Sequence, residues 1–174
     1  ADGKSENHAV MAVRITAGLG IFEELDHEQA EVLKAAILNH NLPRIPVGVI
    51  SQVHLYSALL RDADKLDIWR VSLEYNIFHE IRNEALPDAY QVPPGLLKCF
   101  AESRVIGLEQ VASYYDSILF RLSWLYDLNF PFTVRIFSDR GIAPKLLSRL
   151  PASPQLDVIL EHISEFIRKS VKKN

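Results

Sequence analysis

The chain has 174 residues, 48% of them apolar and 24% charged, and a formal net charge of −3 at pH 7. This balance excludes an intrinsically disordered chain and argues against a nucleic-acid polymer or an anionic membrane as a partner. The single cysteine, Cys99, excludes an internal disulfide framework, and without a signal peptide or a long apolar run we expect a cytoplasmic protein with no membrane span.

The spacing of apolar residues is helical along most of the chain. Five stretches carry apolar side chains three and four residues apart, the pattern of amphipathic helices. These stretches are residues 6–17, 27–40, 48–69, 108–127 and 154–171. No alternation typical of a β-strand stands out. The sequence therefore predicts an all-α bundle of six to eight helices.

Capping and turn residues agree with this division. Asp26 is placed to cap the second of these helices, and Pro43 follows its end. Several prolines make residues 85–95 an irregular connection, and Pro131 starts a new short helix. Ser153 directly precedes Pro154, so we expect Ser153 to cap a helix that has Pro154 in its first turn.

The third helix carries charged residues close to its apolar face. At about 100° per residue, Asp67 falls inside the apolar arc and Asp64 at its edge, while Asp62 lies on the far edge. Arg61 and Lys65 point away from the arc. Acids on a buried margin are costly unless they are ion-paired, hydrogen-bonded or bound to a metal. Ion pairing along the helix is the commoner fate, so both interpretations stay open.

Two histidines also lie on apolar stripes. His8 shares a stripe with the apolar residues of the first helix, and His40 lies in the middle of the apolar arc of the second. With Asp64 they put a potential metal ligand on each of three helices, and this donor set suits Mn, Fe, Ni, Zn or Mg. The alternative is a pair of hydrogen-bonded core histidines. Cys99 is interpreted as a buried thiol. Four histidines are interpreted as surface residues: His27, His54, His79 and His162.

The phrase RDADKLDIWRV (61–71) resembles the last metal motif of the HD-domain superfamily of metal-dependent phosphohydrolases, an all-helical family. SENHAVMAV (5–13) is similar to the family's segment with a histidine at the start of a helix. AAILNHNLP (35–43) is similar to its helix that ends in a histidine before a proline-containing loop. SWLYDLNFP (123–131) resembles the C-terminal extension of some bacterial members, so the likeness covers most of the chain.

The resemblance implies that Asp64 is the catalytic, metal-ligating aspartate and that His8 and His40 bind metal or line a phosphate pocket. The residues implied to orient these ligands or to bind phosphate are Asp67, Arg61 and Lys65. The implied cofactor is a divalent metal ion. The implied reaction is hydrolysis of a phosphomonoester or nucleotide, a phosphorylated small molecule, by a metal-activated water.

The His-Asp doublet that names the family is absent from this chain. We therefore expect a single HD-like helical domain over 1–174 that lacks its N-terminal helices. Residues 1–84 would carry the motif and residues 95–174 would pack on them. The alternative function is an inactive HD-like regulatory or interaction domain. A homodimer is also considered, because the aromatic stretch 124–132 suits either the core, which we favour, or a dimer face.

Overall fold

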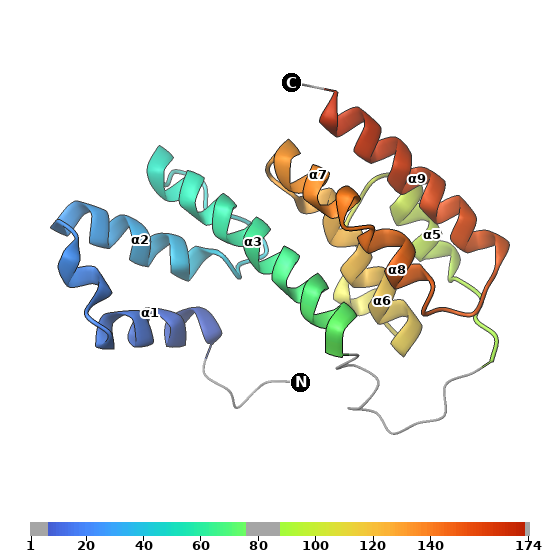
Figure 1. Cartoon of the computed structure of the whole chain (residues 1–174), viewed down its shortest axis with the longest axis horizontal. Helices are drawn as coiled ribbons and strands as arrows, with labels where there is room; N and C mark the ends of the chain where they lie inside the picture. Colours follow the sequence, from blue (N-terminus) through green and yellow to red (C-terminus); the bar gives the residue numbers. More distant parts are fainter. Residues whose placement is uncertain (1–6, 76–87, 173–174) are drawn as a thin grey trace. The chain divides into compact units, whose positions relative to one another are not determined.

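The protein is all-α. The structure, a computed structural model, describes residues 7–75 and 88–172, and within these ranges it contains eight α-helices and no strand (Figure 1). The all-α prediction is confirmed. No helix in the described ranges is both long and apolar enough to cross a membrane.

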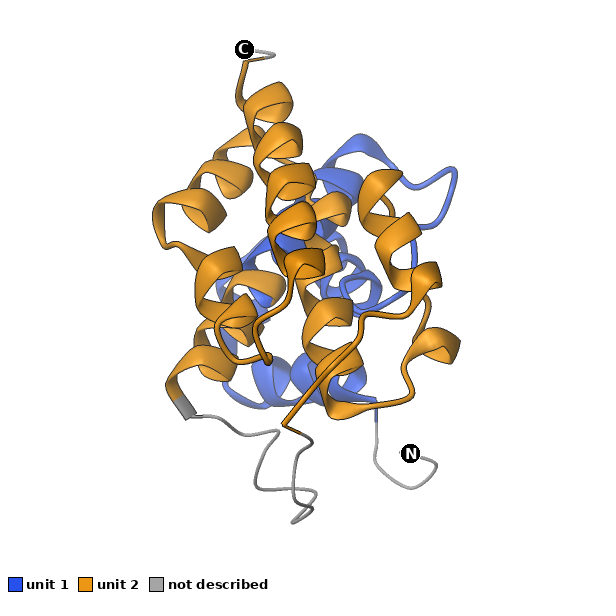
Figure 2. Ribbon diagram, turned by 90° about the vertical axis from the view of Figure 1, so that its right-hand side faces the viewer, with its two compact units in different colours: residues 1–64 blue, residues 65–174 orange. Residues whose placement is uncertain are grey.

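The chain divides into two compact units, residues 1–64 and residues 65–174, which Figure 2 shows in different colours. The division falls within one helix rather than in the predicted connection over 85–95. Whether the chain behaves as a single domain stays a prediction, and each unit is described by itself.

Unit 1 is built from a helical hairpin and the start of a long helix. Helix α1 (His8–Gly18) leads through the 3-10 turn η1 (Ile21–Glu24) into α2 (His27–Asn39), and α1 packs against α2 (Figure 1). Asp26 caps α2 as predicted, because its carboxylate accepts from the Gln29 amide at 2.8 Å and the Gln29 side chain accepts from the Asp26 amide at 3.3 Å.

Helix α3 (Ser51–Tyr75) crosses the boundary between the units and is longer than the predicted stretch. Its buried residues in unit 1 are spaced as a helical stripe, and they are small or polar rather than large and apolar: Val53, Ser57, Ala58, Arg61 and Asp62. Apart from Val53, the apolar residues that defined the predicted arc are at least partly exposed, with Leu55 at 46% and Leu59 at 45%. The predicted buried face of this helix was therefore wrong.

Unit 2 holds the large hydrophobic core. It contains the second part of α3, α5 (Pro94–Ala101), α6 (Tyr114–Ser123), α7 (Pro131–Asp139), α8 (Ile142–Leu147) and α9 (Pro154–Val171). Short 3-10 turns η2 (Leu108–Gln110) and η3 (Trp124–Asp127) flank α6. Fully buried side chains from these helices meet in one cluster that includes Trp69, Phe100, Leu122, Phe137 and Ile159.

The helix predicted over 108–127 is interrupted, so that prediction was wrong. The Ser113 hydroxyl accepts from the Asp116 amide at 3.1 Å, and the buried Asp116 carboxylate accepts from the amides of Ala112 at 3.1 Å and Ser113 at 2.9 Å. This capping box starts a new helix at Tyr114, and the backbone of its N-cap residue Ser113 is extended.

Other sequence predictions have mixed outcomes. Pro131 and Pro154 each occupy the first turn of a helix, as predicted. Ser153 precedes α9, but its buried hydroxyl makes no hydrogen bond to any described residue, so it is not a side-chain cap. Cys99 is buried, as predicted. In the aromatic stretch Leu125 is fully buried whereas Phe132 is 68% exposed.

Candidate functional site

The structure brings together two of the three predicted metal ligands. His8 is the first residue of α1 and His40 follows the last residue of α2, so packing of α1 on α2 places both at the same end of the hairpin. Their Nε2 atoms lie 3.2 Å apart. The rings meet edge to face, with centroids 5.1 Å apart and an angle of 69° between planes. His8 is exposed and His40 is half-buried.

The second nitrogen of His40 fixes which atom faces His8. His40 Nδ1 lies 2.6 Å from the backbone oxygen of Ile37, an acceptor, so Nδ1 carries a proton and donates it. In the neutral ring Nε2 then has a free lone pair, and His8 Nε2–H donates to it. An acceptor nitrogen of a well-oriented imidazole therefore points at the partner ring.

Two asparagines repeat the contact beside the histidines. Asn7 caps α1, since its Oδ1 accepts from the Ala9 amide at 2.9 Å, and it also accepts from Asn41 Nδ2 at 2.7 Å. Asn41 Oδ1 is buried and finds no hydrogen-bond partner among the described residues. Asn7-His8 and His40-Asn41 thus face each other through two pairs of side chains. The asparagines were not predicted, although each of the two histidines has an asparagine next to it in the sequence.

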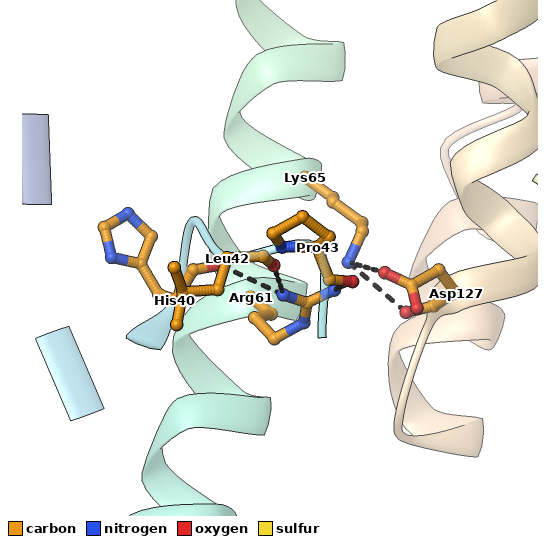
Figure 3. A network of polar contacts seen from close by, with 6 residues as sticks. All are labelled: His40, Leu42, Pro43, Arg61, Lys65 and Asp127. Carbon is orange, nitrogen blue, oxygen red and sulfur yellow. Dashed lines mark hydrogen bonds and ion pairs between the residues drawn. The ribbon is translucent and has the colours of Figure 1, made fainter. Parts of the chain in front are cut away.

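Arg61 holds the loop that follows His40. Its guanidinium donates to the backbone oxygens of His40 at 3.4 Å, Leu42 and Pro43 at 3.4 Å (Figure 3). Arg61 is only 7% exposed, which corrects its predicted orientation away from the core. A planar guanidinium is suited to bind several carbonyls at once, so Arg61 sets the position of the His40 end of α2.

Lys65 also lies inward, against prediction, and is 8% exposed. Within unit 2 its Nζ contacts Asp127 Oδ2 at 2.9 Å and donates to the Asp127 backbone oxygen at 3.3 Å (Figure 3). This contact joins α3 to the end of η3. The amino group is thereby engaged in a structural ion pair.

The three acids of the DADKLD phrase have different surroundings. Asp67 is exposed and its Oδ1 accepts from Arg70 Nε at 3.0 Å and Nη2 at 2.8 Å, so it forms the ordinary ion pair along a helix. Asp62, predicted on the far edge, is instead buried at 2% exposure. Asp64 is half-buried and makes no hydrogen bond or ion pair with other described residues. The helical wheel misplaced Asp62 and Asp67 because it was centred on apolar residues that are exposed.

Asp64 does not complete a cluster with the two histidines. In residues 7–75 and 88–172 no three side chains of His, Cys, Asp or Glu are grouped closely enough to hold a metal ion. The histidine pair by itself offers two nitrogen donors. Of the four histidines interpreted as surface residues, His27 and His54 are exposed, His162 is half-buried and His79 lies outside the described residues.

Comparison with known proteins finds no relative of this chain. No family model, curated protein or solved structure matches the chain.

Proposed function

We propose that the protein is a metal-dependent phosphohydrolase of the HD type, in which His8 and His40 supply two of the metal ligands. The observation that carries the proposal is the 3.2 Å separation of the two Nε2 atoms. Zn–N bonds of about 2.0–2.1 Å in a tetrahedral site put neighbouring donor nitrogens about 3.3 Å apart. The two imidazoles therefore have the spacing of one edge of a metal coordination shell.

The surroundings of His40 support the same role. Histidines that bind metals commonly donate their other ring N–H to a carboxylate or backbone carbonyl, which orients the ring. The hydrogen bond from His40 Nδ1 to Ile37 O is of this kind. Arg61 also holds His40, because its guanidinium donates to the His40 backbone oxygen. For both Nε2 atoms to bind a metal, His8 has to give up the proton that it now donates to His40.

The proposed reaction is hydrolysis of a phosphomonoester or nucleotide. A divalent cation bound at the histidines supplies Lewis acidity toward a phosphoryl oxygen and lowers the pKa of a water molecule. Asp64 is proposed as the catalytic carboxylate, because it lies in the DADKLD phrase and has no other described partner that would neutralise it. Arg61 and Lys65 hold other parts of the chain in this structure, so phosphate binding by either requires them to exchange partners.

Metal binding by the histidine pair is tested first. Isothermal titration of the full chain with Zn²⁺ or Mn²⁺ is compared between the wild type, His8→Ala and His40→Ala. His54→Ala is the matched control, because His54 is exposed, lies in the same unit, and its side chain has no described partner. We expect each pair variant to weaken binding by about 10-fold to 100-fold, and the control to bind as the wild type does. If all four proteins bind the metal equally well, His8 and His40 are not metal ligands.

Hydrolysis is tested separately with p-nitrophenyl phosphate and a panel of nucleotides in the presence of the metal. We expect metal-dependent turnover that Asp64→Asn abolishes, whereas Asp157→Asn, an exposed acid on α9, leaves it unchanged. Turnover that persists in Asp64→Asn would contradict the catalytic assignment while leaving metal binding intact.

A second function, a helical regulatory or interaction domain without catalysis, is favoured by two observations. Asp64 is not grouped with the histidines, and Asp67 is engaged by Arg70. This alternative predicts no metal in elemental analysis of the purified protein and no fall in thermal stability on adding EDTA. The phosphohydrolase proposal predicts that the purified protein contains metal and that EDTA lowers its thermal stability.

A further inference from the structure

A second candidate site lies in unit 2, away in sequence from the histidine pair. The C-terminal turns of α3, the junction of α7 with α8, and the end of α8 line a cavity of about 720 Å³ that is open to the surface. Cavities that bind small organic molecules have volumes of about 300–1,000 Å³. The cavity is therefore large enough for a ligand of the size of a nucleotide.

Cationic side chains predominate around this cavity. Four of them line it against one acid, Glu74, and they are Arg70, Arg140, Lys145 and Arg149. Arg70 is neutralised, since its guanidinium contacts Asp67 at 2.8 Å and Glu74 at 2.7 Å. The guanidinium of Arg140 and the amino group of Lys145 have no acid within salt-bridge distance on the described residues that line the cavity.

Arg140 and Lys145 present charge that other described residues leave unmatched. Arg140 is exposed, and its guanidinium makes no hydrogen bond or ion pair with any described residue. Lys145 Nζ donates to the Arg140 backbone oxygen at 2.8 Å, which ties the two residues together and uses one of its three protons. Neither forms a salt bridge within residues 7–75 and 88–172.

Arg149 is held in place at the cavity wall. Its Nη1 donates to the Ser72 backbone oxygen at 2.6 Å and its Nη2 to the Leu73 backbone oxygen at 2.8 Å. The guanidinium is thus oriented by α3 before any ligand arrives, which lowers the entropic cost of binding. Its charge also reaches the buried Arg121: burial lowers the pKa of Arg121 to about 10, Tyr114 raises it, and Arg149 has the smallest effect, which lowers it.

Apolar side chains form the rest of the lining. Leu66 and Leu73 from α3 face the same cavity as Ile142 from α8. A site of this composition suits a ligand with an anionic group and an apolar or ring portion, since guanidinium groups match the oxygens of phosphate in pairs. A bare inorganic ion would leave the apolar wall uncovered.

We propose that this cavity binds a small organic phosphate, with the phosphate on Arg140, Lys145 and Arg149 and the organic part against the leucines. The site is independent of the proposed phosphohydrolase chemistry, because all of its residues belong to unit 2 whereas His8 and His40 belong to unit 1. Binding here requires no metal.

The test is isothermal titration of the full chain with ATP, adenosine and pyrophosphate, at low salt and with EDTA present. EDTA separates this site from the metal-dependent proposal. We expect ATP to bind at least about 10-fold more tightly than either adenosine or pyrophosphate, because only ATP has both parts of the ligand. We expect Arg140→Gln and, as an independent variant, Lys145→Gln to weaken ATP binding by about 5-fold or more.

The matched control is Arg135→Gln, since Arg135 is an exposed arginine on α7 that does not line the cavity. It should leave ATP binding within about 2-fold of the wild type, as a distant surface charge is largely screened. The proposal is overturned if ATP fails to bind at about 1 mM, or if adenosine or pyrophosphate binds as tightly as ATP. It is also overturned if Arg135→Gln weakens ATP binding as much as Arg140→Gln does.

Discussion

Arg61 offers the sharpest test of how the histidine site is built. It is 7% exposed and donates to three backbone oxygens of the loop after α2, those of His40, Leu42 and Pro43. Replacement by Met keeps much of the buried aliphatic volume but removes every donor. The substitution therefore removes the hydrogen bonds that hold His40 and its loop.

The expected magnitude follows from those bonds. A hydrogen bond from a charged donor contributes about 1.5–3 kcal/mol, but two of the three here are long at 3.4 Å, and the freed carbonyls regain some contact with water. We expect a net loss of about 2–4 kcal/mol in the free energy of local opening. At about 1.4 kcal/mol per tenfold, amide exchange in the loop should accelerate about 30-fold to 1,000-fold.

Hydrogen exchange followed by mass spectrometry reads this region directly. Tryptophan fluorescence would not, because Trp69 and Trp124 both lie in unit 2. Arg44→Met is the matched control, as Arg44 is an exposed arginine in the same loop and has no described hydrogen-bond partner. If exchange near His40 is no faster in Arg61→Met than in this control, Arg61 does not hold the loop and the account of the site is wrong.

Three further predictions concern unit 2 and are read by urea unfolding followed through tryptophan fluorescence. Ser113→Ala removes the capping hydroxyl of α6 and should cost about 1 kcal/mol, whereas Ser138→Ala on the exposed side of α7 should cost almost nothing; equal costs would refute the cap. Leu122→Ala should cost about 2–5 kcal/mol because Leu122 is fully buried, and a loss below about 1 kcal/mol would contradict its place in the core. Tyr90→Phe should change how the free energy of unfolding depends on pH. Burial is the main cause that raises the pKa of the Tyr90 phenol, and the 2.5 Å hydrogen bond that Tyr90 Oη donates to Asp116 raises it further. The folded protein then keeps a proton that the unfolded chain loses above pH 10, so wild-type stability should fall as the pH rises beyond that value. Because Arg121 titrates in the same range, the informative quantity is the difference between the two proteins, and parallel pH profiles would count against the shift.

Local signals in the sequence predicted most of the helical segments. The Asp26 and Gln29 pair and the first-turn prolines 131 and 154 act through neighbouring atoms, so their effect can be read without tertiary structure. The break at Ser113 was also local, but the apolar period that continues through it masked the capping box.

The sequence by itself determined an all-α chain and selected His8 and His40 as residues of interest. Only the tertiary structure decided that their Nε2 atoms meet, because that contact depends on the packing of α1 against α2 across 32 positions of sequence. It also decided which side of α3 is buried. In unit 1 that side carries Ser57, Arg61 and Asp62, whose burial is sustained by specific partners, such as the carbonyls bound by Arg61, that no periodicity of apolar residues reveals.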